Sequence, residues 1–95
     1  MRKYETMFIL KTGLEQEVKE KLMNKFKGII EADGEIEKID EWGNRKLAYE
    51  IDKNVEGYYV VINFKAATDV PKELDRNFKI ADQVMRSIIV NVDEK

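Results

Sequence analysis

Residues 41–51 read Glu-Trp-Gly-Asn-Arg-Lys-Leu-Ala-Tyr-Glu-Ile, and this stretch decides more about the fold than any other part of the chain. Apolar side chains recur in its second half with a period of two, at Leu47, Tyr49 and Ile51. Such alternation is typical of a strand with one buried face. Gly43 inside the same run weakens strand pairing and usually marks a bulge or a bend. We therefore predict a strand that bends near Gly43.

Two adjacent cations, Arg45 and Lys46, follow the predicted bend. Because neighbouring side chains of a strand point to opposite faces, these two cations are expected to point in opposite directions. A bent strand with charge beyond its bend presents side chains to a partner. Trp42, just before the bend, has two interpretations. As structure it covers apolar surface at the base of a hairpin, and as function it packs against a partner protein or a ribose.

The segments around this strand predict the order strand, helix, strand, strand, helix, strand. Apolar residues alternate along residues 3–10, whereas residues 58–64 are rich in β-branched and aromatic side chains on both faces, which indicates a central strand. The four expected strands cover residues 3–10, 36–51, 58–64 and 88–92, with a hairpin loop at 52–57 and a frayed end at 93–95.

The first helix is expected between the first two strands. Thr12 and Glu15 are spaced as a capping box that starts a helix, and Gly34 supplies a stop after Ala32 or Asp33. Between these limits apolar residues recur at helical spacing, at Leu14, Val18, Leu22, Phe26, Ile29 and Ile30.

The second helix is expected after the third strand. Thr68 or Asp69 caps it, and Pro71 falls in the first turn, where its missing amide hydrogen needs no partner. The apolar stripe of this helix consists of Leu74, Phe78 and Ala81.

The element order predicts the fold class. Each half of the chain repeats a β-α-β pattern, and right-handed crossovers with short connections favour a four-stranded antiparallel sheet with both helices on one face. We therefore predict an α+β fold, a ferredoxin-like sandwich of the order β-α-β-β-α-β. With 95 residues and one proline, the chain is expected to form one domain over residues 1–95.

Composition limits the chemistry that the chain can perform. It contains no cysteine and no histidine, which excludes disulfides, thiolate metal ligands and the side chain that most often transfers protons near neutral pH. We expect no enzyme activity, no metal, no cofactor and no small-molecule substrate. No apolar run approaches the ~20 residues that span a bilayer, and the first residues do not form a signal peptide, so we expect a soluble, cytoplasmic protein without membrane contact.

The charge balance argues against a protein that holds nucleic acid through its overall field. Lysine and arginine number 17 against 19 acidic residues, for a net charge of -2. Phosphate contact then depends on local clusters of cations or on a basic partner. Arg2 with Lys3 forms one cluster and Arg45 with Lys46 another, and the bend at Gly43 is expected to bring the two clusters to one edge.

One face of the predicted sheet is left without helices. Met7, Ile9, Tyr59 and Val61, together with Ile89, are expected on this face, where polar residues are the norm for an antiparallel sheet in water. An apolar patch there indicates a surface for a protein or for stacked bases. The alternative is that loops or the terminal tail cover it, or that the patch is small and has no partner.

Residues 43–51 resemble the signature of the bacterial small-subunit ribosomal protein six family, whose members carry glycine, two cations, Leu, Ala or Ser, Tyr and Ile in this order. The similarity extends to residues 2–5, 57–59 and 74–90 and so covers nearly the whole chain. Three positions depart from the family pattern and lower the local positive charge: Lys46 in place of arginine, Glu50 in place of proline and Asp52 in place of an uncharged or basic residue. A lysine offers a point charge, whereas an arginine offers a planar two-pronged donor.

The resemblance implies a structural protein of the ribosome in the cytoplasm. Members of this family are held by small-subunit ribosomal RNA through a few basic residues and form a heterodimer with small-subunit ribosomal protein eighteen. The implied RNA contacts are Arg2, Lys3, Arg45, Lys46 and, at the end of the second helix, Arg86. The expected partner contacts are Met7, Ile9, Trp42, Tyr59 and Val61.

Other functions of this fold are alternatives, of which we treat the RNA-recognition motif as a coincidence of strand composition and expect no acylphosphatase activity. Residues 56–64 superficially resemble the aromatic strand of an RNA-recognition motif, but Glu56, Tyr59 and Val60 stand where that motif has a basic, a small and an aromatic residue. An acylphosphatase would hold a phosphoryl group with one arginine and one asparagine, for which Arg45 and Asn44 are the candidates. A small-molecule-sensing domain of the same architecture would pair through its sheet edges, which the surface charges disfavour.

Overall fold

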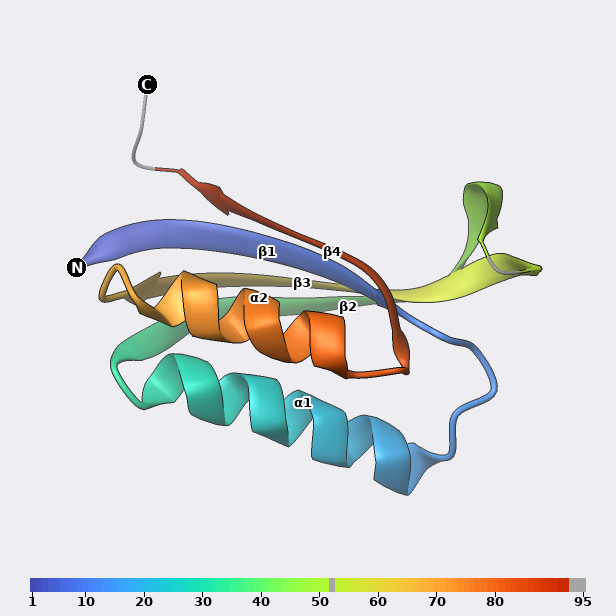
Figure 1. The fold of residues 1–95 in the computed structure, drawn as a ribbon, viewed down its shortest axis with the longest axis horizontal. Helices are drawn as coiled ribbons and strands as arrows, with labels where there is room; N and C mark the ends of the chain where they lie inside the picture. Colours follow the sequence, from blue (N-terminus) through green and yellow to red (C-terminus); the bar gives the residue numbers. More distant parts are fainter. Residues whose placement is uncertain (52, 93–95) are drawn as a thin grey trace.

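The structure, a computed structural model, describes residues 1–51 and 53–92. The elements follow the predicted order (Figure 1). Their bounds are β1 Arg2–Leu10, α1 Gln16–Glu31, β2 Gly34–Ile51, β3 Asn54–Ala66, α2 Val70–Ile80 and β4 Val84–Asn91. Neither helix in these ranges is long and apolar enough to cross a membrane.

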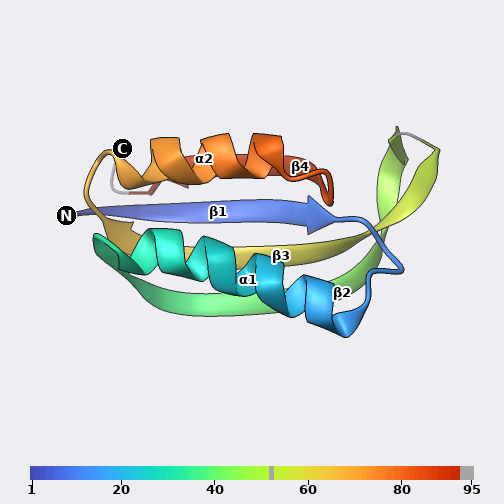
Figure 2. The ribbon, with the colours of Figure 1, turned by 60° about the horizontal axis from the view of Figure 1, so that its bottom comes forward.

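The four strands form one antiparallel sheet in the order β2-β3-β1-β4. Both helices cover the same face of this sheet, and the opposite face, here called the open face, is covered by neither of them (Figure 2). β3 lies between β2 and β1, as its apolar residues on both faces predict. The α+β ferredoxin-like sandwich is therefore confirmed.

Three phenylalanine rings join the helices to the sheet. The ring of Phe8 in β1 lies 5.3 Å from that of Phe26 in α1 and 4.9 Å from that of Phe78 in α2, measured between centroids. The rings of Phe26 and Phe78 are 4.7 Å apart, and all three side chains are fully buried. Aromatic pairs of this kind contribute roughly 0.5–1.5 kcal/mol beyond the burial of their area. The apolar positions with strand and helix periodicity thus meet in one core.

The start of α1 differs from the prediction. Its first residue is Gln16, and Glu15 takes the N-cap position with an extended backbone but without a side-chain capping bond. The predicted capping box of Thr12 and Glu15 is therefore wrong, because Thr12 lies three residues before the N-cap and cannot serve the first-turn amides. Glu17 places a negative charge in the first turn, where it interacts favourably with the helix dipole.

α2 begins as predicted, with Asp69 at the N-cap and Pro71 in the first turn, although Asp69 makes no side-chain capping bond. Leu74 and Phe78 are buried against the sheet. Ala81 follows the last helical residue as the C-cap, with an extended backbone. The buried apolar residues of the helix are Val70, Leu74 and Phe78, so the stripe lies nearer the N-terminus of α2 than the sequence indicates.

Gly34 does not end α1, as the sequence predicts, but begins β2. α1 ends at Glu31, with Ala32 as its C-cap. A Cβ atom at position 34 would lie 2.3 Å from the carbonyl oxygen of Lys65 and 2.7 Å from the Cβ atom of Ala66. Glycine is needed here because the backbones of β2 and β3 approach closely, and not because a helix end needs a left-handed residue.

The hairpin between β2 and β3 has a shorter connection than predicted. β3 begins at Asn54, so a loop over residues 52–57 is wrong. Gly57 pairs with Arg45 and is part of the ladder, because long β2 carries the pairing beyond its own bend. Position 52 and the predicted frayed end at 93–95 lie outside the described residues.

Candidate nucleic-acid and protein interface

The predicted bend in β2 is confirmed. Gly43 has a φ of +81°, a left-handed conformation that favours glycine, and the register between β2 and β3 shifts between Glu41 and Gly43. Beyond this bulge the hairpin curls away from the side that the helices cover (Figure 1). The bend therefore carries the end of the hairpin toward the open face.

Arg45 and Lys46 lie beyond the bend, and both side chains are exposed. In the strand register Arg45 is opposite Gly57 and Lys46 is opposite Glu56. The glycine leaves one side of Arg45 uncrowded, whereas the carboxylate beside Lys46 offsets part of its charge. The stronger positive potential of this pair therefore lies on the side of Arg45.

The two basic clusters do not meet at one edge, which corrects the prediction from the sequence. Arg2 pairs with Ala66 of β3, whereas Arg45 pairs with Gly57 of the same strand. These positions are nine residues apart, which corresponds to roughly 30 Å along the strand at about 3.3 Å per residue. A bend at Gly43 cannot close that gap, because β1 runs antiparallel to β3 and its basic end lies at the opposite end of the sheet.

Arg86 lies in β4 and not at the end of the second helix, because β4 already begins at Val84. Its guanidinium carbon lies 5.1 Å from the ring centroid of Tyr49 in the hairpin, which is a cation–π contact between β4 and β2. Arg86 is thus placed between the sheet and the curled hairpin. No local pattern in the sequence signals this contact, since 37 positions separate the two residues.

Leu47 packs the hairpin against the sheet beside Ile9 and Met85. Its side chain is only 8% exposed although its neighbours in the sequence are exposed. A Cβ atom at Gly57 would lie 2.3 Å from Ile9, 2.9 Å from Met85 and 3.4 Å from Leu47. These side chains therefore converge over Gly57 and leave no room for another side chain.

The structural interpretation of Trp42 is confirmed, whereas its contact with a partner stays a prediction. Its ring lies parallel to that of Tyr59, with 6.0 Å between centroids, so it covers part of the neighbouring strand. It is still 47% exposed. One side of the indole is therefore structural, and the rest of it faces the surroundings.

The open face is apolar, but its exposed residues differ in part from those predicted. Ile9 and Val61 lie on this face and yet are buried: Ile9 lies over Gly57 with Leu47 of β2 and Met85 of β4, and Val61 lines a hollow with Trp42 and Ile88. Ile89 packs on the core beneath the helices, which corrects its predicted place on the open face. The exposed apolar positions of β4 on the open face are instead Ile88 and Val90. The alternation along β4 would have placed Ile88 and Val90 on the open face if the strand had been recognised to begin at Val84.

A shallow hollow of about 250 Å³ lies in the middle of the open face. Met7 and Val61, which pair directly with each other, contribute to its lining from the two central strands. The remaining lining comes from Trp42 on one side, from Ile88 and Val90 on the other, and from the carboxylate-bearing Glu5. The hollow thus offers apolar surface beside one negative charge.

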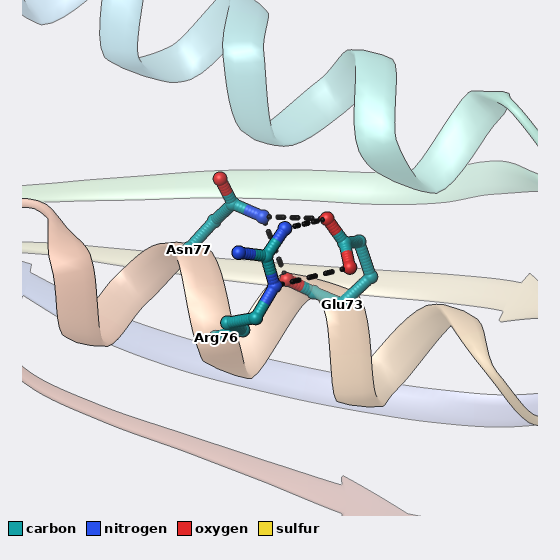
Figure 3. A network of polar contacts seen from close by, with 3 residues as sticks. All are labelled: Glu73, Arg76 and Asn77. Atoms are coloured by element: carbon teal, nitrogen blue, oxygen red, sulfur yellow. Dashed lines mark hydrogen bonds and ion pairs between the residues drawn. The ribbon is translucent and has the colours of Figure 1, made fainter.

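One cluster of polar side chains lies within α2. Arg76 and Asn77 both bond to Glu73 within α2, with 2.6 Å between the arginine Nη2 and the carboxylate Oε1 (Figure 3). The hydrogen bond from Arg76, followed by that from Asn77, holds the pKa of Glu73 below its ordinary value. Among the residues that the structure describes, no group of three acidic side chains is arranged to hold a metal ion.

Tyr58 forms a second polar contact at the base of the hairpin. Its hydroxyl donates to the Glu41 carboxylate at 2.6 Å, and the amine of Lys19 in α1 lies 4.2 Å from its ring centroid. The hydrogen bond to Glu41 and partial burial raise the pKa of Tyr58 to about 12. The contact joins α1, β2 and β3 where the bend begins.

The chain is similar to known proteins over nearly its whole length. Residues 3–91 match the family model described as Ribosomal protein S6. The small ribosomal subunit protein bS6 of Alkaliphilus oremlandii is 61% identical over 94 residues, which cover 99% of this chain and all of that protein. The protein of the same name from Clostridioides difficile is 52% identical over 90 residues, or 95% of this chain and 98% of its own length.

A solved structure has the same fold. The crystal structure of 30S ribosomal protein S6 from Thermotoga maritima superimposes with a TM-score of 0.87 and 36% sequence identity, covering 95% of this chain and 86% of that one. The family match, the identity over the full length and the shared architecture agree. The chain therefore belongs to the ribosomal protein S6 family of the small ribosomal subunit.

Proposed function

We propose that this chain is a structural, non-enzymatic constituent of the small subunit of the cytoplasmic ribosome, and that it binds small-subunit ribosomal RNA as a heterodimer with small-subunit ribosomal protein eighteen. Membership of the family supports the place in the ribosome. The exposed apolar surface of the open face carries the finer proposal, because an antiparallel sheet face in water is normally polar.

The partner surface is the apolar patch of the open face. Met7, Trp42 and Tyr59 belong to it, as do Ile88 and Val90, whereas Ile9 and Val61 support it from below as buried residues. Exposed aromatic and aliphatic side chains at the centre of a surface are the usual anchors of a protein interface. The acidic Glu5 in the same hollow favours a partner with positive charge.

The RNA contacts are proposed at the cations. Arg2 and Lys3 lie at one end of the sheet, whereas Arg45, Lys46 and Arg86 lie at the hairpin end. With a net charge of -2, these few cations alone give weak binding, so the partner supplies further phosphate contacts. The two proteins together then hold the RNA more tightly than this chain does.

A filter-binding titration tests this proposal. The isolated chain and its equimolar mixture with the partner are titrated with a small-subunit ribosomal RNA fragment at two salt concentrations. We expect weak binding by the chain alone and a clear gain in affinity with the partner. Tight binding by the isolated chain with a steep salt dependence would contradict partner dependence, and the absence of any gain would overturn the proposal.

A matched pair of variants tests the role of the apolar patch. Trp42→Ala removes an exposed ring from the patch, and Val55→Ala removes exposed apolar surface from the hairpin, outside it. We expect Trp42→Ala to weaken partner binding by about tenfold or more and Val55→Ala by less than about twofold. Isothermal titration calorimetry with the partner measures both, and equal losses would argue against the patch.

A further inference from the structure

The edges of the two outer strands of the sheet differ in how well they are protected against the addition of another strand. β2 and β4 are the outer strands, so each has one side without a neighbouring strand among the described residues. Such an edge exposes backbone donors and acceptors to which another chain can add. Proteins that avoid this place charges, bulges or prolines on their edges.

β2 carries these protective features. Eight of its 18 residues are charged, and its register against β3 shifts at three places, one before the bend, one at the bend and one beyond it. Lys38 and Asp40 form an ion pair of 3.4 Å on this strand. The edge of β2 is therefore poorly suited to the regular addition of another strand.

β4 lacks these features. Arg86 is the only charged residue in the sequence from 84 to 92, and the stretch Ser-Ile-Ile-Val-Asn-Val from residue 87 has high strand propensity. Ile88 and Val90 are 53% and 42% exposed, and Val92 is 50% exposed. The register of β4 against β1 shifts near Leu10, beyond this stretch.

The hydrogen-bonding pattern shows which backbone groups of β4 point outward. The amide of Val92 donates to the carbonyl of Lys3 at 3.0 Å, so residues 92, 90 and 88 bond inward to β1. By the alternation of an antiparallel ladder, the backbone groups of Ser87 and Ile89 point away from the sheet. These two residues give an added strand donors and acceptors at the regular spacing.

Hollows flank β4 on both sides. The hollow of the open face adjoins Ile88 and Val90. On the helix side, a second hollow of about 450 Å³ lies between β4 and α2 and is lined by Tyr4, Pro71, Lys72, Asp75, Ile89 and Asn91. Strand addition is most specific where pockets receive the alternating side chains of the incoming segment, and β4 has such space on both faces.

We propose that an extended segment of the protein partner adds to the edge of β4 as a fifth strand. This inference rests on the proposed function and specifies how the partner is held. The segment carries apolar side chains that lie beside Ile88 and Val90, together with a cationic side chain that reaches Glu5 in the open-face hollow. On the other side of the segment, small apolar side chains lie beside Ile89 at the hollow next to α2.

A partner segment accounts for the surface better than a second copy of this chain does. Two copies joined by their β4 edges would form one continuous sheet, and the apolar patches of both would stay exposed on its open face. A segment of a larger partner covers the edge and the patch together. The negative charge of Glu5 within the hollow also favours a cationic partner over another copy of an acidic chain.

Ser87 provides a matched test of the edge. Ser87→Pro removes an outward amide and places a ring in the path of an added strand, while the inward bonds of residues 88 and 90 remain. Ser87→Ala keeps the amide and removes only the hydroxyl. We expect Ser87→Pro to weaken partner binding by about tenfold or more and Ser87→Ala by less than about twofold.

Amide hydrogen exchange of the unmodified chain gives a second readout that does not depend on how the variant folds. With small-subunit ribosomal protein eighteen as the partner, we expect exchange at Ile89 to slow by at least about tenfold, beyond the change at Lys38 on the β2 edge. A thermal melt of Ser87→Pro shows whether the variant is folded. If it is not folded, the exchange of Ile89 in the unmodified chain tests strand addition alone.

The outcomes separate the two proposals. Strand addition is overturned if Ser87→Pro leaves partner binding unaffected and the partner leaves the exchange of Ile89 unchanged. In that case the proposed heterodimer is still supported. No binding to the unmodified chain overturns both. Protection of Ile89 that rises with the concentration of this chain alone identifies a second copy as the occupant and overturns the partner segment.

Discussion

Two glycines in β2 meet different needs. Gly43 adopts a left-handed φ with open space where a side chain would be, whereas Gly34 lacks a positive φ and has the backbone of β3 against it. The first is needed for conformation and the second for space. The local sequence indicates the bend at Gly43, but it does not indicate the close approach at Gly34, which involves a strand about thirty residues further along.

Gly34→Ala should destabilise the protein. Its new Cβ atom would lie 2.3 Å from the Lys65 carbonyl oxygen, so the backbone must shift, and we expect the free energy of unfolding to fall by about 1–3 kcal/mol. Gly28→Ala is the control, because position 28 lies in α1 with no atom within 4 Å of an added Cβ. It should raise the free energy of unfolding by roughly 0.5–1 kcal/mol. Urea denaturation measures both, and equal effects would refute the close approach.

The contact of Tyr58 with Glu41 predicts a pH dependence. The pKa of Tyr58 rises from 10.0 to about 12 in the folded protein, mainly because its hydroxyl donates to the Glu41 carboxylate. Since the folded-state pKa exceeds the unfolded one, the stabilisation is fully present below pH 10.0 and is lost as the pH rises toward about 12. We expect Glu41→Gln to return the tyrosine titration toward its ordinary range and to flatten this loss.

The ultraviolet absorbance of tyrosinate follows this titration, and Tyr58→Phe identifies the contribution of Tyr58 among the tyrosines of the chain. Chemical denaturation across the same pH range gives the stability. A titration of Tyr58 that is the same with glutamate or glutamine at position 41 would show that the hydrogen bond is not the cause.

At the level of elements, the hairpin depends on its contacts with β4. Tyr49→Leu removes the ring beneath Arg86, and we expect a loss of about 0.5–1 kcal/mol in the local stability of the hairpin. Amide exchange at residues 44–51 should then accelerate by roughly two- to fivefold. Tyr49→Phe keeps the ring and should leave these rates nearly unchanged. Equal acceleration in both variants would mean that the hydroxyl, and not the ring, holds the hairpin.

The same contacts show how far the sequence could predict the elements. Periodicity within a segment was enough to find the strands and the helices, because local alternation reports which side is buried, and the glycine within the second strand was enough to predict the bend at Gly43. It failed at the hairpin, where charged residues and Gly57 are typical of a loop but are held in β3 by pairing with distant residues of β2. It also failed for Arg86, since recognising the start of β4 at Val84 depended on its pairing with β1.

The candidate surface was predicted less completely than the fold. Met7 and Tyr59 followed from alternation and from the absence of a helix on one face, and Trp42 followed from its place just before the bend. Ile88 and Val90 were missed because a strand that starts at residue 88 has too few positions to show which face each residue occupies. The burial of Ile9 and Val61 depends on neighbours in other strands, which a single segment of sequence does not reveal.

At the level of the whole molecule, charge distribution should decide how RNA binding responds to salt. Arg45→Gln combined with Lys46→Gln removes the hairpin cations. We expect the slope of log affinity against log salt to fall by roughly 1 for each phosphate that the variant no longer neutralises, so by up to about 2. Lys21→Gln combined with Lys25→Gln is a control of equal charge change on α1. Filter binding of the proposed heterodimer gives the slopes, and the same decrease in both variants would assign the effect to net charge alone.

The placement of the basic doublets at opposite ends of the sheet limits the shape of any RNA that touches both. Arg2 and Arg45 are separated by nine positions of β3, and the rigid central strands prevent them from approaching each other. A single short RNA loop therefore cannot contact the cations at both ends of the sheet at the same time. An RNA held at both must either follow the long axis of the protein or bring two separate segments to it, in which case the protein acts as a brace that sets the distance between them.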